Sequence, residues 1–72
     1  MDTTRYQEVH GAKPKGDGLW TFQITATDGN GAYTTDTLTG WGIPSEARKE
    51  AVSKLKFQCA RIKSIVEIEL LP

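Results

Sequence analysis

The chain has 72 residues, with nine Lys or Arg, nine Asp or Glu, and a formal net charge of zero at pH 7. A chain of this length forms one domain, residues 1–72, and buries only about 60% of its unfolded surface, which leaves little volume for a deep substrate cavity and argues against an enzyme. Zero net charge provides no overall field that would attract the protein to nucleic acid or to a membrane.

Residues 1–18 are predicted to form a short strand followed by a flexible loop. The strand would span Thr4–Val9, with Tyr6 as its best core residue, and the alternative is that this segment contains no strand. Residues 11–18 include three Gly, one Pro and two Lys, a composition typical of a loop.

The clearest element is a strand over residues 19–27. Apolar side chains alternate there with threonine and glutamine, which is the period-two pattern of a half-buried strand. The side chains expected to face the core are those of Trp20, Phe22, Ile24 and Ala26. The threonine and glutamine side chains between them would face solvent or a partner.

The sequence Asp28-Gly29-Asn30-Gly31 predicts a β-hairpin, because Gly and Asn tolerate the positive φ angles that tight turns require. The return strand should run from Ala32 to about Thr39. Gly40-Trp41-Gly42 would end this strand, with Trp41 covering one end of the core.

Two registers of the hairpin are open, and they place different side chains opposite Phe22. A three-residue loop brings Leu38 and Asp36 to the Phe22 face, whereas a two-residue turn brings other residues there. The residues that the two-residue turn places on that face are Tyr33, Thr35 and Thr37. We prefer the two-residue turn, because it keeps the Asp36 carboxylate out of the core.

A helix is predicted from Pro44 to about Arg61. Ser45 is its expected N-cap, and Glu46 would lie in the first turn, where the helix dipole favours an acid. Helical spacing gathers apolar side chains on one face, namely Ala47, Ala51, Val52, Leu55, Cys59 and Ile62. The opposite face carries Lys49, Ser53, Lys54, Lys56, Phe57 and Arg61.

Residues 64–71 predict a second amphipathic strand, in which apolar side chains alternate with two glutamates. The inward side chains would be Val66, Ile68 and Leu70, and the solvated ones Glu67 and Glu69. Together with residues 19–63 this strand forms a hairpin–helix–strand core. The chain therefore predicts an α+β fold, a three- or four-stranded and mainly antiparallel sheet with one helix packed on one face, in the order β-β-β-α-β or β-β-α-β.

No motif predicts a catalytic residue, a metal site or a cofactor. His10 and Cys59 lack the paired spacing of zinc ligands, and Cys59 falls in the apolar helix stripe, where it would act as a small hydrophobe. The lone cysteine, a start without an apolar leader and the absence of an apolar run of about 18 residues favour a cytoplasmic location without membrane contact.

Two features point to an interaction surface. Phe57 lies on the outer helix face among cations, where an aromatic ring is a plausible binding anchor. Charge is also segregated, because residues 46–63 hold six of the nine basic residues and only two of the nine acids. The candidate binding residues are therefore Phe57, Lys49, Lys56, Arg61 and Lys54.

The order of elements resembles that of small β-β-β-α-β proteins such as the N-terminal domain of HicB-type antitoxins. The likeness rests on Asp17-Gly18-Leu19-Trp20 opening a strand, on a second strand, and on Ser45-Glu46-Ala47 opening an amphipathic helix. In size and architecture the chain also resembles phage-encoded proteins, including anti-CRISPRs, that bind and block a host machine. The resemblance implies a small α+β domain and transfers no functional residue to this chain.

The expected function is that of a non-enzymatic module that binds a larger protein, in one version a phage or mobile-element inhibitor of a host machine. The alternative is a nucleic-acid-binding domain that uses the basic helix face together with the loop residues Lys13 and Lys15. A homodimer formed through an open sheet edge or through packed helices is a further expectation.

Overall fold

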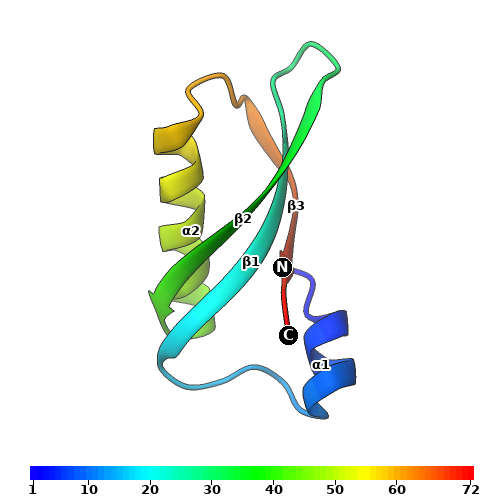
Figure 1. Cartoon of the computed structure of the whole chain (residues 1–72), viewed down its shortest axis with the longest axis vertical. Helices are drawn as coiled ribbons and strands as arrows, with labels where there is room; N and C mark the ends of the chain where they lie inside the picture. Colours follow the sequence, from blue (N-terminus) through cyan, green and yellow to red (C-terminus); the bar gives the residue numbers. More distant parts are fainter.

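A computed structural model describes residues 1–72 as five elements in the order α-β-β-α-β (Figure 1). The elements are α1 (Thr4–His10), β1 (Gly18–Thr27), β2 (Tyr33–Gly42), α2 (Pro44–Gln58) and β3 (Ser64–Leu70). The predicted α+β class is confirmed, with a three-stranded sheet and with two helices instead of one.

The sheet has the strand order β2-β1-β3, and both strand pairs are antiparallel. The long helix α2 packs against β2 and β1, and the hydrophobic core lies between this helix and the sheet. Figure 1 shows α2 alongside the strongly twisted sheet, with both chain ends beside β3. No helix is long and apolar enough to span a membrane.

Strand β1 supplies the centre of the core, as its alternating pattern predicts. Phe22, Ile24 and Ala26 are buried, and Trp20 packs partly buried against them. The indole Nε1 of Trp20 donates a hydrogen bond to the carbonyl oxygen of Gly42 at 2.9 Å, which provides a partner for the only polar atom of that side chain.

The preferred hairpin register is wrong, and the three-residue loop is the one observed. Phe22 pairs with Leu38, and Ile24 pairs with Asp36. The N–H of Asp28 donates to the carbonyl of Ala32 at 3.2 Å, so three residues connect the two sides. This register buries Leu38, while Asp36 stays half-exposed at the rim, so the carboxylate retains water and the apolar gain decides the register.

The prediction that Trp41 covers an end of the core is also wrong. Strand β2 continues through Gly42, and the alternation turns Trp41 to the outer face, where it pairs with Leu19 and remains 64% exposed. Gly40 is the inward residue at this level. The backbone of Ala47 passes so close to Gly40 that no side chain would fit there.

Helix α2 begins at Pro44 as predicted, but its N-cap lies two residues earlier than predicted and its last residue three residues sooner. Ile43, not Ser45, is the N-cap, and Pro44 takes the first helical position, where its fixed φ is favourable. The helix ends at Gln58, so Arg61 lies in the turn that leads to β3. The buried residues of its inner face are Ala47, Ala51 and Leu55.

Strand β3 departs from the predicted alternation at one point. A register irregularity pairs Thr25 with Glu67 but Ala26 with Ile65, so Val66 is the extra residue. Ile65 therefore packs against the core, whereas Val66 is 54% exposed, in contrast to its predicted inward position. Beyond the irregularity Ile68 and Leu70 face inward as predicted.

Of the two alternatives for Thr4–Val9, the strand is wrong, because this segment forms helix α1, and the elements after it follow the alternative order β-β-α-β. Local contacts hold the helix: Tyr6 stacks on His10 one turn later, with ring centroids 4.2 Å apart. Gly11 ends the helix in the left-handed conformation at φ 71°, and its N–H donates to Gln7. Tyr6 still reaches the core, since its ring lies 5.6 Å from that of Trp20.

Strand pairing at the N-terminus occurs instead at Asp2. Its N–H donates to Ile68 and its carbonyl accepts from Leu70, which forms an isolated parallel bridge on the outer edge of β3. The Asp2 carboxylate also accepts the N–H of Thr4 at 2.9 Å, and this hydrogen bond lowers the pKa of Asp2. One residue therefore pairs with the sheet edge and also helps to begin α1.

Candidate functional site

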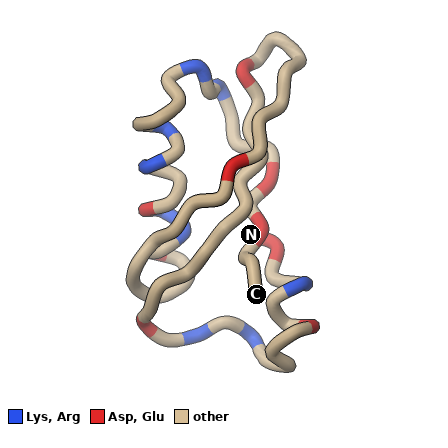
Figure 2. Tube along the Cα trace, in the orientation of Figure 1, with Lys and Arg blue, Asp and Glu red and all other residues tan.

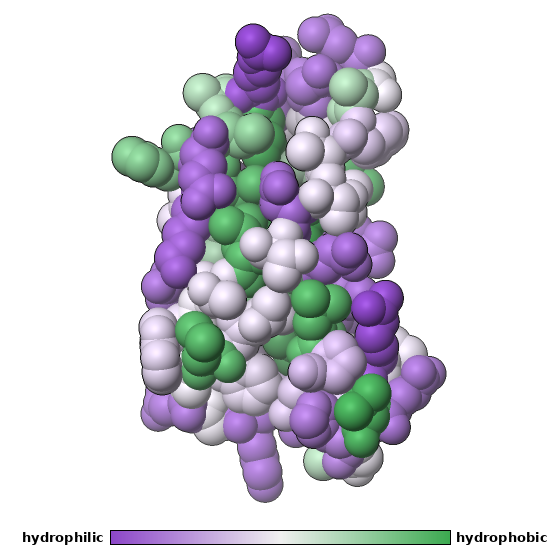
Figure 3. Space-filling view, viewed as in Figure 1, coloured by the Kyte–Doolittle hydropathy of each residue, from purple (hydrophilic) through white to green (hydrophobic).

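The candidate sites of this protein are surfaces. The molecule contains no pocket, and nowhere do three potential metal-ligating side chains lie together. Figure 3 shows hydrophobic side chains reaching the surface in several separate places. The apolar residues that are both large and well exposed include Phe57, Tyr33, Trp41, Leu19 and Val9.

Phe57 is 92% exposed, which is the highest value among the large hydrophobic residues. Helical spacing places it on one ridge with Ser53 and Lys49, four and eight residues earlier, and all three are exposed. Lys56 precedes it and is also exposed. We call Lys49, Ser53, Lys56 and Phe57 the outer ridge of α2. An aromatic ring in water beside Lys56, at the end of a ridge that also carries Lys49, is what the helical periodicity predicts.

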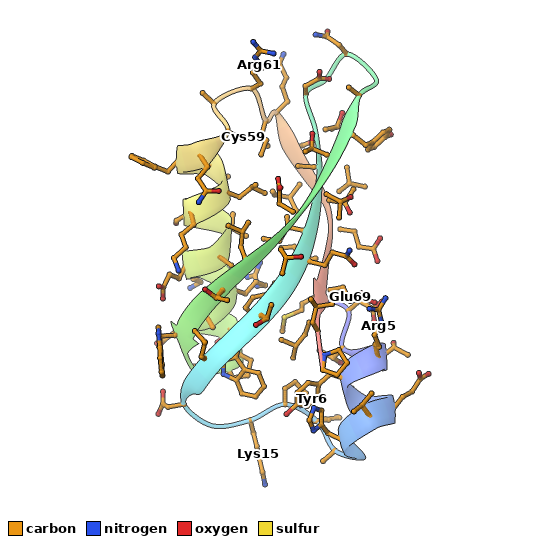
Figure 4. The ribbon with its side chains drawn as sticks, viewed as in Figure 1. Arg5, Tyr6, Lys15, Cys59, Arg61 and Glu69 are labelled. Carbon is orange, nitrogen blue, oxygen red and sulfur yellow. The ribbon has the colours of Figure 1, made fainter.

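The two other predicted site residues do not belong to this ridge. Arg61 is exposed, but it lies beyond the end of α2 near Cys59 (Figure 4). Lys54 is half-buried, because its ammonium donates to the carbonyl of Thr39 at 2.9 Å and lies 3.5 Å from a carboxylate oxygen of Glu50. Lys54 is therefore engaged within the fold, and the candidate binding set reduces to the ridge with Arg61 nearby.

Glu50 and Lys54 together cover part of the outer edge of β2. A carboxylate oxygen of Glu50 accepts a hydrogen bond from the backbone N–H of Trp41 at 2.9 Å. This contact lies two residues along β2 from Thr39, whose carbonyl is bound by Lys54. The hydrogen bond from Trp41 lowers the pKa of Glu50, burial opposes this effect, and the charge of Lys54 reinforces it. The pair joins α2 to the edge strand in addition to the apolar core.

We expect the Glu50→Gln variant to lose stability at pH 7 and the difference from wild type to shrink below about pH 4. Because the pKa of Glu50 is lowered by folding, the unfolded chain binds this proton at a higher pH than the folded chain. The stabilisation is therefore complete above the ordinary glutamate range and is lost as the pH falls through the folded pKa. Glutamine keeps an oxygen for Trp41, so the variant isolates the charge.

Urea unfolding at pH 7 and near pH 3 measures this difference. Glu8→Gln is the matched control, since Glu8 is an exposed acid on α1 without a hydrogen bond or an ion pair to its side chain. An equal loss at both pH values for Glu50→Gln would contradict the electrostatic explanation.

Charge is segregated in space as well as in sequence. Figure 2 shows Lys and Arg along α2 and the turn that follows it, and acids along the sheet. The outer sheet face is less acidic than predicted, because Glu69 forms an ion pair with Arg5 at 3.1 Å and its side chain is only 16% exposed (Figure 4). Glu67 remains exposed.

The basic residues do not form one continuous surface. Lys15 projects from the loop at one end of the molecule, whereas Arg61 lies at the other end (Figure 4), and the longest extent of the chain is 38 Å. The fold therefore does not bring together Lys15 and Arg61, two residues of the predicted nucleic-acid site.

The outer sheet face carries features that sequence reasoning missed. Trp41 and Leu19 form an exposed cross-strand pair at one end, and Tyr33 is exposed at the other. Thr25 and Thr35 place their hydroxyls 3.2 Å apart between these ends. The register of the hairpin decides which side chains of β2 face outward. The correct register would therefore have predicted these exposed aromatic residues.

Comparison with known proteins found no relative of this chain. No protein-family model, no curated protein and no solved structure matches the chain.

Proposed function

We propose that this chain is a non-enzymatic module that binds a larger protein through the outer ridge of α2. The observation that carries the proposal is the 92% exposure of Phe57 beside Lys56 on the outer ridge of α2. Aromatic residues dominate the energetic centres of protein interfaces, and cations around them add orientation and faster association.

The partner expected for this ridge offers an apolar pocket for the Phe57 ring with acidic residues at its rim. Lys56 adjoins Phe57 on α2, Lys49 lies two turns earlier on the same ridge, and Arg61 adds a further cation beyond the helix end. A small domain without a pocket acts on a partner by covering part of its surface. Binding and inhibition of a host machine by a phage or mobile-element protein, inside the cytoplasm, is the concrete version that we favour.

The experiment compares capture of the partner by immobilised wild-type protein, Phe57→Ala and Lys56→Glu from a lysate of the native host. The captured protein is then purified, and its affinity is measured by calorimetry. We expect Phe57→Ala to weaken binding about 30-fold or more, as for a central interface anchor, and Lys56→Glu to slow association.

Val9→Ala is the matched control, because Val9 is an exposed apolar residue on α1, outside the ridge. It should bind as the wild type does. If a partner is captured equally well by Phe57→Ala and Lys56→Glu while both variants remain folded, the ridge is not the binding site.

Nucleic-acid binding is the alternative that the basic surface of α2 supports. Binding through phosphate contacts would weaken steeply with salt. A gel-shift series with DNA and RNA between about 50 and 200 mM salt tests it. Retardation that is lost in Lys49→Glu and Lys56→Glu but kept in Phe57→Ala would favour this alternative over protein binding.

A further inference from the structure

The two edges of the sheet are protected to different extents. In an antiparallel sheet, alternate residues direct both backbone polar groups to the same side. The carbonyl of Thr27 accepts from Lys63 and that of Thr21 from Leu71, so odd-numbered residues of β1 face β3 and even-numbered residues face β2. The observed pairing then directs the odd-numbered residues of β2 to its free edge.

Contacts at Thr39 and Trp41 agree with this assignment. The outward carbonyl of Thr39 accepts a hydrogen bond from Lys54, and the outward N–H of Trp41 donates one to Glu50. On the opposite edge of the sheet, Asp2 pairs with the outward backbone groups of β3 at Ile68 and Leu70. The first half of β2 is therefore an uncovered part of the sheet edge, where the outward groups belong to Tyr33, Thr35 and Thr37. The start of β3 is not covered by Asp2 either, but it contains the irregularity at Val66.

This uncovered segment lacks most of the features that usually protect an edge strand, and its one such feature is the charge of Asp36 on the core face. Residues 33–37 contain no proline, no lysine and no bulge, and three of the five are threonine, which favours strands. Asp36 is the only charge, and it is half-exposed with no hydrogen bond or ion pair to its side chain. A regular edge with one unpartnered carboxylate is suited to receive another strand.

We propose that residues 33–37 of β2 pair antiparallel with the same segment of a second copy of the chain, about a twofold axis at Thr35. This register joins Thr35 to Thr35 of the other copy, and Tyr33 to Thr37 in both directions. Each of these three pairs exchanges two backbone hydrogen bonds. The outward N–H and C=O groups of the segment are thereby all used.

The register follows from the chemistry of the segment. Shifting the axis to Asp36 would place two carboxylates directly opposite each other, which is unfavourable. Shifting it to Thr37 would require outward groups of Thr39 and Trp41 that Lys54 and Glu50 already occupy. The axis at Thr35 instead places the hydroxyl of Thr34 opposite the Asp36 carboxylate of the other copy. The twofold symmetry makes this pair occur two times in the dimer. This polar complementarity identifies a second copy as the occupant.

The dimer would have a continuous six-stranded sheet, and the outer ridge of α2 is not part of the pairing. The inference therefore does not depend on the proposed function. An interface limited to these residues is small, so we expect a weak, concentration-dependent dimer with a dissociation constant in the micromolar range.

Sedimentation equilibrium of the full chain from about 1 μM to 1 mM tests the dimer, with Thr35→Pro as the disrupting variant. Proline removes the outward N–H of Thr35 and, as valine also does, the hydroxyl that lies 3.2 Å from that of Thr25. Proline is tolerated on an edge strand. We expect it to weaken association at least tenfold. Thr35→Val keeps the N–H and should dimerise as the wild type does. A wild type that remains monomeric at 1 mM, or a Thr35→Pro variant that dimerises normally, overturns the proposal.

Cross-linking reads the register directly and does not rely on the folding of the proline variant. In a Cys59→Ser background, Thr35→Cys should form an intermolecular disulfide on oxidation, because this residue meets itself at the axis. Thr37→Cys is the matched control and should cross-link at least tenfold more slowly. Equal rates, or faster cross-linking of Thr37→Cys, overturn the proposed pairing. Phe57→Ala should leave both readouts unchanged.

Discussion

Replacement of Gly40 by alanine is expected to destabilise the protein by about 3 kcal/mol or more. Gly40 is fully inside the contact between β2 and α2, and an added Cβ would lie 2.8 Å from the carbonyl carbon of Ala47 and closer still to its oxygen. These are backbone atoms, so no side-chain rotation relieves the clash. Helix α2 must move away from the sheet.

Gly18→Ala is the matched control for this substitution. Gly18 is also a strand glycine, it does not have a positive φ angle, and an added Cβ meets no atom within 4 Å. Urea unfolding should therefore show a change within about 0.5 kcal/mol for Gly18→Ala. Similar losses for the two variants would mean that the close approach of α2 to Gly40 is not what the fold requires.

Truncation of Phe22 to alanine is expected to cost about 3–5 kcal/mol. Phe22 is completely buried at the centre of β1, and it is the largest of the fully buried side chains. Only eight residues form the hydrophobic core, so the cavity left by this ring has few neighbours that can move to fill it. At roughly 0.05–0.15 kcal/mol per residue, a domain of this length has a total stability of about 4–11 kcal/mol, so this one substitution removes a large share of it, as urea unfolding would measure.

Phe57→Ala makes the same substitution as Phe22→Ala, but at a side chain that is almost fully exposed to solvent instead of completely buried. Its effect on the free energy of unfolding should lie within about 0.5 kcal/mol. A measured loss above about 1 kcal/mol would show that the ring is buried in solution, and the proposed binding anchor would be withdrawn. A neutral result makes Phe57→Ala a clean variant for binding, because any lost affinity then reflects the interface.

Strand β1 and the inner face of α2 could be derived from the sequence because their side-chain periodicity is local. The alternation around Phe22 and Ile24 and the helical spacing of Ala47, Ala51 and Leu55 each specify a face without reference to distant residues. The exposure of Phe57 follows from the same helical geometry. These elements carry most of the core and the whole candidate ridge.

The conformation of the N-terminal segment depends on contacts between residues one turn apart, which the strand preference of single residues does not include. Thr4, Tyr6 and Val9 favour strands by intrinsic preference, but the Tyr6–His10 stack and the glycine that ends α1 favour a helix. The preference of each residue is small, so a few contacts one turn apart decide the conformation.

Sequence alone determined the α+β class, the central strand, the long helix and the aromatic ring that this helix holds in water. Tertiary structure alone decided the hairpin register, the outward position of Trp41, the irregularity at Val66 and the engagement of Lys54. The physical reason is that alternation and helical period are properties of neighbours in the chain, whereas register depends on the burial gained when separate segments meet. Burial of Leu38 against the helix outweighed the placement of Asp36, and that comparison exists only once the helix is packed on the sheet.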